Sequence, residues 1–198
     1  MGDKDINKQS IKNLRTKSCF IQAAKEIVLR EGVENVSVRK VADQAGYTFA
    51  TIYNYFKDLN ELLQEVKNEM ILDVMTYMQK SVPEKIYDLD DVKKLNHHYI
   101  DYYIERPNVF RFFYSYRLHS VIEPQEEVLD YSKLYFDTYR GFVIGGVIKE
   151  KEIPVIAKTI IYTLHGLLAL YFSDNGMTRE MLYDEMNKTI EYLLERRY

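Results

Sequence analysis

The fold of this chain is decided between Ser37 and Phe56, where the sequence reads SVRKVADQAGYTFATIYNYF. Apolar side chains recur at spacings of three and four, which places them on one face of a helix: Val38, Val41, Ala42 and Ala45. Ser37 can cap this helix by accepting a backbone N–H bond. Gly46 supplies the left-handed backbone that ends it in a sharp turn.

The residues after Gly46 predict a second short helix, which Thr48 can cap. Its inner side carries Ile52 and Phe56. Its outer side carries one exposed set: Phe49, Ala50, Tyr53, Asn54 and Lys57. Two short helices joined by a tight turn form a helix-turn-helix, in which the second helix enters the major groove of DNA.

The exposed side chains of both helices have chemistry that suits DNA. Phosphate contacts are expected from hydroxyl and charged groups on the second helix, at Thr48, Thr51, Tyr53 and Lys57, and on the first, at Ser37, Arg39 and Lys40. Asn54 can pair with adenine through two hydrogen bonds, and Phe49 or Ala50 can touch a thymine methyl group. The alternative is a pair of solvated helices in an ordinary helical protein.

The same stretch resembles the signature of TetR-type bacterial transcriptional regulators. The resemblance is carried by Gly46-Tyr47-Thr48, by Thr51-Ile52-Tyr53-Asn54-Tyr55-Phe56-Lys57 and by Glu61-Leu62-Leu63, and it extends from about Arg15 to Val66. The chain departs from the family pattern at Leu59, where lysine is common, and at Phe49, which is larger and more apolar than usual. The resemblance implies a DNA-binding dimer and supports Thr48, Thr51, Tyr53 and Lys57 best as DNA contacts.

Composition and charge agree with a globular protein that contacts DNA through one end. The chain has 198 residues, a formal net charge of −3 and one cysteine, Cys19, which excludes a disulfide within one chain. Residues 1–60 hold ten lysines and arginines against seven aspartates and glutamates. Helical spacing to Ala23 and Ile27 predicts a small core side chain at Cys19.

The chain contains no predicted membrane anchor. Its start is polar, unlike a signal peptide. The longest apolar run, Val155 to Phe172, is interrupted by Lys158, Thr159 and His165. A membrane span needs about 20 largely apolar residues, so we expect a cytoplasmic protein without membrane contact.

The rest of the chain predicts an all-α fold of about nine helices. Residues 10–57 form a three-helix DNA-binding domain, and residues 58–198 form a helical domain for effector binding and dimerisation. Asp58 and Glu61 can form a capping box at the start of a long helix. This helix begins next to the DNA-binding domain and ends in the second domain, so we expect it to connect the two. Pro154 opens the penultimate helix and Thr178 caps the last.

The last two helices are expected to form a dimer interface. The penultimate helix is too apolar to have only one buried face, and Gly166 would allow close approach. The predicted interface residues are Ile160, Leu164, Leu167, Leu168 and Ile190, which would form a four-helix bundle across a two-fold axis. Burial of both helices in the core of one chain is the alternative.

Aromatic side chains crowd the middle of the chain and suggest a cavity for a largely apolar or aromatic ligand. The candidates are Tyr99, Tyr102, Tyr103, Phe110, Phe113, Tyr114, Tyr139 and His165. Helical spacing of tyrosines is equally typical of a core, so the expectation of an effector site rests mainly on the family resemblance.

No set of residues in the sequence predicts catalysis, a cofactor or a metal. His97 and Asp101 could share a helical face, but no third ligand has the required spacing, and His97 is expected to be solvated. The sequence therefore indicates a ligand-responsive DNA-binding regulator, a repressor that binds a palindromic operator as a dimer. The alternatives are a TetR-like regulator without a small ligand, controlled by a partner or acting as an activator, and a helical enzyme or adaptor.

Overall fold

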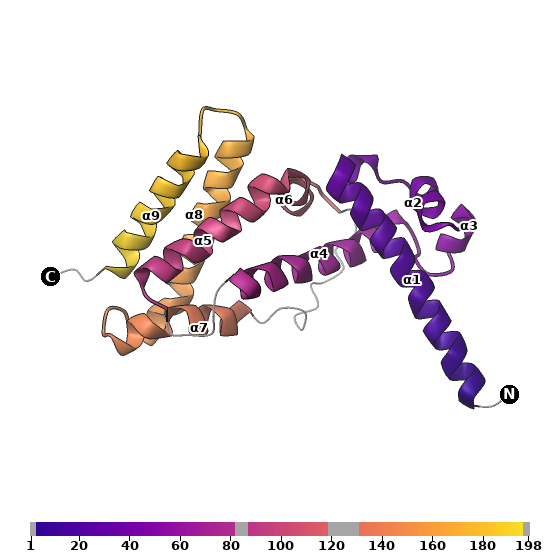
Figure 1. Ribbon diagram of the computed structural model, residues 1–198, viewed down its shortest axis with the longest axis horizontal. Coiled ribbons are helices and arrows are strands. Elements are labelled where there is room, and N and C mark those ends of the chain that lie inside the picture. The colour runs from indigo at the N-terminus through magenta and orange to yellow at the C-terminus, as the bar shows by residue number, and fades with distance from the viewer. Residues whose placement is uncertain (1–2, 82–86, 119–130, 196–198) are drawn as a thin grey trace. The chain divides into compact units, whose positions relative to one another are not determined.

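The computed structural model describes residues 3–81, 87–118 and 131–195, which contain nine α-helices and no strand. The helices are α1 (Asp3–Glu31), α2 (Val38–Ala45), α3 (Phe49–Ile52), α4 (Leu59–Ser81), α5 (Leu89–Glu105), α6 (Pro107–Tyr114), α7 (Tyr131–Ile144), α8 (Ile153–Phe172) and α9 (Arg179–Leu194) (Figure 1). Short 3-10 helices cover Val33–Asn35 and Glu150–Glu152. The all-α prediction is confirmed.

The chain divides into two compact units. In the described residues, the first unit comprises 3–73 and 106–118, and the second comprises 74–81, 87–105 and 131–195. The first unit therefore contains α6 as well as the three amino-terminal helices that we expected to form a domain over residues 10–57. Helix α4 contributes its first fifteen residues to one unit and continues into the other.

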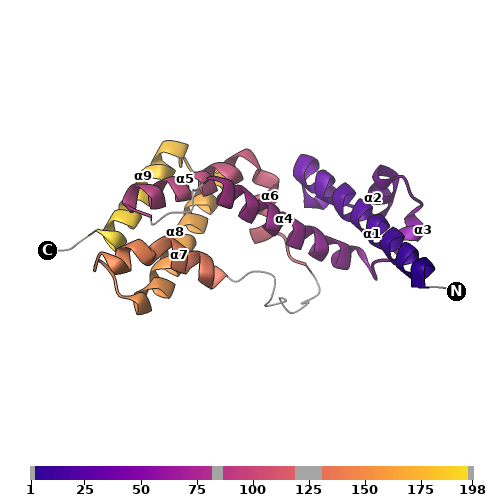
Figure 2. The same cartoon turned by 60° about the horizontal axis from the view of Figure 1, so that its bottom comes forward.

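The first unit is built around α1, which packs on α2 and α6, with α2 packed on α3. Figures 1 and 2 both show α2 and α3 together beside α1. The apolar positions predicted on α1 form the centre of this core, with exposed fractions of 6% or less: Phe20, Ala23, Ala24, Ile27 and Val28. Cys19 is exposed, contrary to the core position that its spacing predicted.

Local signals fix the turn between α2 and α3 as the sequence predicted. The Ser37 hydroxyl accepts a hydrogen bond from the backbone N–H of Lys40 at 3.3 Å, and Gly46 adopts φ 76°. The Gly46 N–H donates back to the carbonyl of Asp43. A side chain with a Cβ would be strained in this left-handed conformation, so Gly46 is required for the turn.

Helix α3 is shorter than the sequence predicted, since it ends at Ile52. The chain continues in a tight turn in which the N–H of Asn54 donates to the carbonyl of Thr51 at 3.2 Å. Thr48 makes no capping hydrogen bond to the backbone, contrary to expectation. Asn54 and Lys57 therefore follow the helix instead of lying on it.

The second unit is organised by α8, which packs on α5, α7 and α9. Figure 1 shows α8 and α9 running side by side, joined by a short connection. The α8 residues facing the core recur at helical spacing: Ile156, Ala157, Ile160, Leu164 and Leu168. Thr178 caps α9 as predicted, since its hydroxyl accepts from the N–H of Met181 at 3.2 Å. The predicted start of α7 near residue 125 lies outside the described residues.

Polar contacts join α5 to α9. Asp101 accepts hydrogen bonds from Arg179 and from the hydroxyl of Tyr183. His97 stacks on Tyr183 with ring centres 4.2 Å apart and lies 2.9 Å from the side-chain oxygen of Asn187. His97 is therefore half-buried in an interhelical contact and not solvated as we expected, and burial lowers its pKa.

Candidate DNA-binding surface and ligand site

The predicted DNA contacts form one surface of the first unit. Eight of the ten side chains are exposed: Ser37, Arg39, Thr48, Phe49, Ala50, Tyr53, Asn54 and Lys57. Thr51 and Lys40 are half-exposed. The buried side of the same segment is held by Ile52 and Phe56, each 1% exposed. The segment thus separates a buried apolar side, which anchors it, from an exposed outer side of mainly polar side chains with Phe49 and Ala50 among them, as groove binding requires.

Two hydroxyls on this surface are paired with each other. The side-chain oxygens of Thr48 and Thr51 lie 2.9 Å apart. One hydroxyl proton satisfies this hydrogen bond, so the second can be donated outward to a phosphate oxygen.

Lys40 differs from the other candidate cations because its charge is already neutralised. Its ammonium group forms an ion pair with Glu31, which is also paired with Arg30 at 2.8 Å. The hydrogen bonds from Lys40 and Arg30 lower the pKa of the Glu31 carboxyl group. The ion pair connects Lys40 on α2 to the end of α1. This geometry gives no support to the assignment of Lys40 as a phosphate contact.

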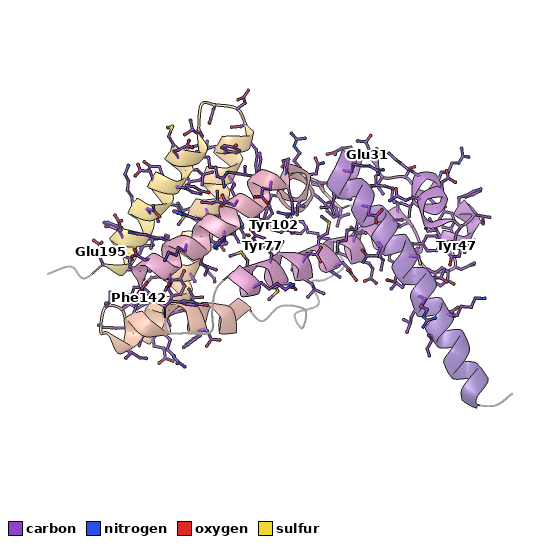
Figure 3. All side chains as sticks on the ribbon, viewed as in Figure 1. Glu31, Tyr47, Tyr77, Tyr102, Phe142 and Glu195 are labelled. Atoms are coloured by element: carbon purple, nitrogen blue, oxygen red, sulfur yellow. The ribbon has the colours of Figure 1, made fainter. Side chains whose placement is uncertain are left out.

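A second group of candidate residues meets in the second unit. The Tyr99 hydroxyl lies 2.9 Å from Nε2 of His165 and donates to the Tyr103 hydroxyl at 3.4 Å. Tyr102 contacts Tyr103 edge to face, and its ring centre lies 5.1 Å from that of Tyr77 (Figure 3). These contacts join α4, α5 and α8, so phenol hydroxyls and one imidazole converge there.

The remaining effector candidates lie on other helices. Phe110, Phe113 and Tyr114 lie on α6 in the first unit, and Tyr114 is 47% exposed. Tyr139 is buried on α7. Sequence reasoning missed Tyr77, although Met70, Val74 and Tyr77 are spaced by four and three on the buried side of α4.

His165 should make the stability of the second unit depend on pH. Burial lowers its pKa from 6.5 to about 4, so the folded state favours neutral imidazole. The same histidine binds a proton more tightly in the unfolded chain than in the folded protein. The free energy of unfolding should therefore fall as the pH decreases from 6.5 to 4. Allowing for partial exposure, we expect a loss of about 1–2 kcal/mol.

Denaturant unfolding at pH 7 and pH 4.5 measures this loss. His165→Gln is the matched variant, because the amide can still hydrogen-bond to Tyr99 but does not titrate in this range. The variant should lose less stability than the parent between the two pH values. Equal losses in both proteins would show that His165 is not the responsible group.

Most of the predicted dimer-interface residues are buried within the single chain. Ile160, Leu164, Leu168 and Ile190 are each 3% exposed or less, and only Leu167 is half-buried. The prediction is wrong for the four buried residues, because a side chain inside the core of one chain has no surface left for a partner. They belong to the alternative that both helices are part of that core.

The opposite face of α8 is uncovered and carries apolar side chains beside the exposed Lys158 and Thr159. Val155 is 67% exposed, Tyr162 68% and Leu170 43%. Gly166 is exposed too, and a Cβ built there would meet no atom within 4 Å. By length and composition, Glu150–Phe172 is the one segment of the described residues that could cross a membrane, but its other face is packed in the protein core.

Comparisons with known proteins agree with the helix-turn-helix. Residues 20–66 match the model of the family described as bacterial regulatory proteins, tetR family. YobS of Bacillus subtilis, an uncharacterised HTH-type transcriptional regulator, is 23% identical over 90% of this chain and 91% of its own length. The nicotine-responsive transcriptional repressor HdnoR of Paenarthrobacter nicotinovorans is 28% identical over 41% of this chain, which spans 40% of HdnoR.

Solved structures share the fold of the whole chain. The RolR complex with resorcinol has a TM-score of 0.69 and 17% identity, covering 95% of this chain and 97% of RolR. A TetR-family regulator from Haemophilus influenzae has a TM-score of 0.65 and 17% identity, covering 90% and 96%. Residues 20–66 thus carry a helix-turn-helix domain that matches the tetR family, and the solved structures show the same fold over most of the chain.

Proposed function

We propose that the protein is a dimeric, ligand-responsive repressor that binds a palindromic operator in the cytoplasm. The main observation in support is the exposed surface of α2, α3 and the following turn. It presents amide, hydroxyl and cationic groups, and apolar side chains on the opposite side of the segment are buried. One such surface reads few bases. Two copies related by symmetry read half-sites about one helical turn of DNA apart.

The dimer interface is assigned to the exposed face of α8, with Val155, Tyr162 and Leu170 as its apolar side chains. Gly166 lies on this face and would let the two backbones approach closely. On α9, Met181 and Tyr192 are also exposed and extend the apolar area. The interface is thus on the helices that the sequence indicated, but on the opposite side of α8.

The effector is assigned to the second unit, next to Tyr99, Tyr103 and His165. The hydrogen-bonded hydroxyls and neutral imidazole suit a small aromatic molecule that carries a hydroxyl group. RolR, which shares the fold, has been solved with resorcinol, a ligand of this class. Because α4 continues from this unit into the DNA-binding unit, a ligand that resets α4 would oppose DNA binding through one reciprocal coupling energy.

Mutations in the recognition segment test the operator assignment. Asn54→Ala should lose preference for one base pair in each half-site, worth about tenfold in discrimination. Lys57→Ala should weaken binding to all DNA sequences alike. It should also reduce the slope of log K for DNA binding against log salt concentration by about one per subunit. Sites are first selected from random DNA and affinities are then measured at several salt concentrations. An Asn54→Ala protein that discriminates like the parent would remove that assignment.

Resorcinol serves as the first probe of the ligand site. If the site accepts this class, resorcinol should raise the melting temperature and weaken operator binding, and Tyr99→Phe should reduce both effects. A broader panel of hydroxylated aromatics extends the same assay. If none of them shifts the melting temperature, the alternative of a regulator without a small ligand is favoured.

A further inference from the structure

An exposed phenyl ring stands at the start of the recognition segment. Phe49 is the first residue of α3 and is 52% exposed. Two neighbouring aromatic rings contact the core: Tyr47 packs against Phe20 with ring centres 5.1 Å apart, and Phe56 is 1% exposed. Tyr53 is 55% exposed like Phe49, but it carries a hydroxyl group that can bond to a phosphate, whereas Phe49 has no polar group. Full burial of a phenylalanine side chain is worth about 1.5–3 kcal/mol. The exposed Phe49 ring contributes much less than this to the stability of the chain.

The contact that the ring does make is with a cation. The guanidinium carbon of Arg39, on α2, lies 5.9 Å from the centre of the Phe49 ring. Among the described residues, Arg39 has no carboxylate within ion-pair distance, whereas the adjacent Lys40 is paired with Glu31. A guanidinium lying against an aromatic ring is attracted by its electrons and keeps its donors directed outward.

We propose that Phe49 and Arg39 act as one reading unit in each operator half-site. The ring packs on the 5-methyl group of a thymine, and the guanidinium held over the ring binds a neighbouring backbone phosphate. Phe49 has no hydrogen-bonding group, and the thymine methyl is the apolar feature of base edges in the major groove. This inference rests on the proposed function. It assigns the thymine contact to Phe49 rather than Ala50 and adds a positioning role for the Phe49 ring.

Removal of single methyl groups from DNA tests the base contact. In an operator obtained by random selection, each thymine is replaced in turn by deoxyuridine, which lacks only the 5-methyl group. At one symmetric pair of positions the parent should lose about fourfold in affinity per half-site, the value of one buried methyl group. Phe49→Ala should bind the two forms of the operator equally.

A double-mutant cycle tests the coupling of the two side chains. Arg39→Ala should weaken binding to all sequences and lower the salt slope by about one per subunit. Phe49→Ala should also reduce the salt slope, because it releases the guanidinium. The double variant should then lose less affinity than the product of the single losses. Phe136→Ala and Arg140→Ala, both exposed on α7, are the matched controls and should bind like the parent.

The outcomes separate this inference from the proposed function. Sequence-specific binding that is unaffected by deoxyuridine at every thymine would overturn the methyl contact and leave the regulator intact. Independent effects of Arg39→Ala and Phe49→Ala would overturn the reading unit. Absence of sequence-specific binding by the parent would overturn both the regulator and the reading unit.

Discussion

Tyr162→Arg should produce a folded monomer that binds its operator about 10²–10⁴-fold more weakly than the parent. A monomer binds each half-site separately, whereas a dimer bound at one half-site holds its second copy close to the other. Tyr162 is 68% exposed in the single chain, so the fold does not depend on its ring. On a two-fold axis, however, each arginine would face the partner helix and its own symmetry copy. Burying these like charges against apolar side chains is strongly unfavourable.

Ile144→Arg is the matched control for this prediction. Ile144, at the end of α7, is also 68% exposed, so it receives the same charge at the same exposure but on another helix. It should remain dimeric and bind the operator like the parent. Sedimentation velocity gives the oligomeric state, and circular dichroism confirms that both variants are folded.

A substitution at Gly166 makes the same test by bulk. A Cβ at Gly166 meets no atom within 4 Å in the single chain, so Gly166→Leu should not strain the monomer. At a close helix approach the leucine side chain would separate the two copies. If both Tyr162→Arg and Gly166→Leu remain dimers of unchanged affinity, the interface is not on this face. Vesicle binding lost by Tyr162→Arg would instead indicate a membrane surface.

The helix-turn-helix could be predicted from sequence because its signals are local. Ser37 and Gly46 act through backbone hydrogen bonds and a backbone angle within a few residues, and both behave as expected. The length of α3 could not be predicted, because the residues after Ile52 keep helical spacing while their backbone bonds change to a tighter turn. Pattern alone does not distinguish these two forms of local structure.

The buried face of α8 illustrates a different limit. The helix is apolar on most sides, and two polar positions on the side of Tyr162, Lys158 and Thr159, were too weak a signal to place Ile160 inward. Packing against α5, α7 and α9 determines which face of α8 is buried, and these contacts involve residues distant in sequence. The pairing of Lys40 with Glu31 was missed for the same reason, since the two residues belong to different helices.

Phe56→Ala should destabilise the first unit by about 3–5 kcal/mol, the usual cost of removing a buried phenylalanine ring. The Phe56 ring is 1% exposed and lies 5.4 Å from the ammonium nitrogen of Lys17 on α1. It anchors the residues that follow α3 to the core. Since domains are stable by only about 5–15 kcal/mol, this loss should be visible as an earlier unfolding transition.

Phe49→Ala supplies the matched comparison, because the same side chain is removed seven residues earlier from an exposed position. Its stability should change by about 0.5 kcal/mol or less. The two variants should therefore lose operator binding for opposite reasons. Phe56→Ala should regain affinity when cooling or an osmolyte restores the folded fraction, whereas Phe49→Ala should bind weakly although fully folded. Denaturant unfolding and operator titration on the same samples measure both quantities. Equal stability of the two variants would show that Phe56 does not support the recognition segment.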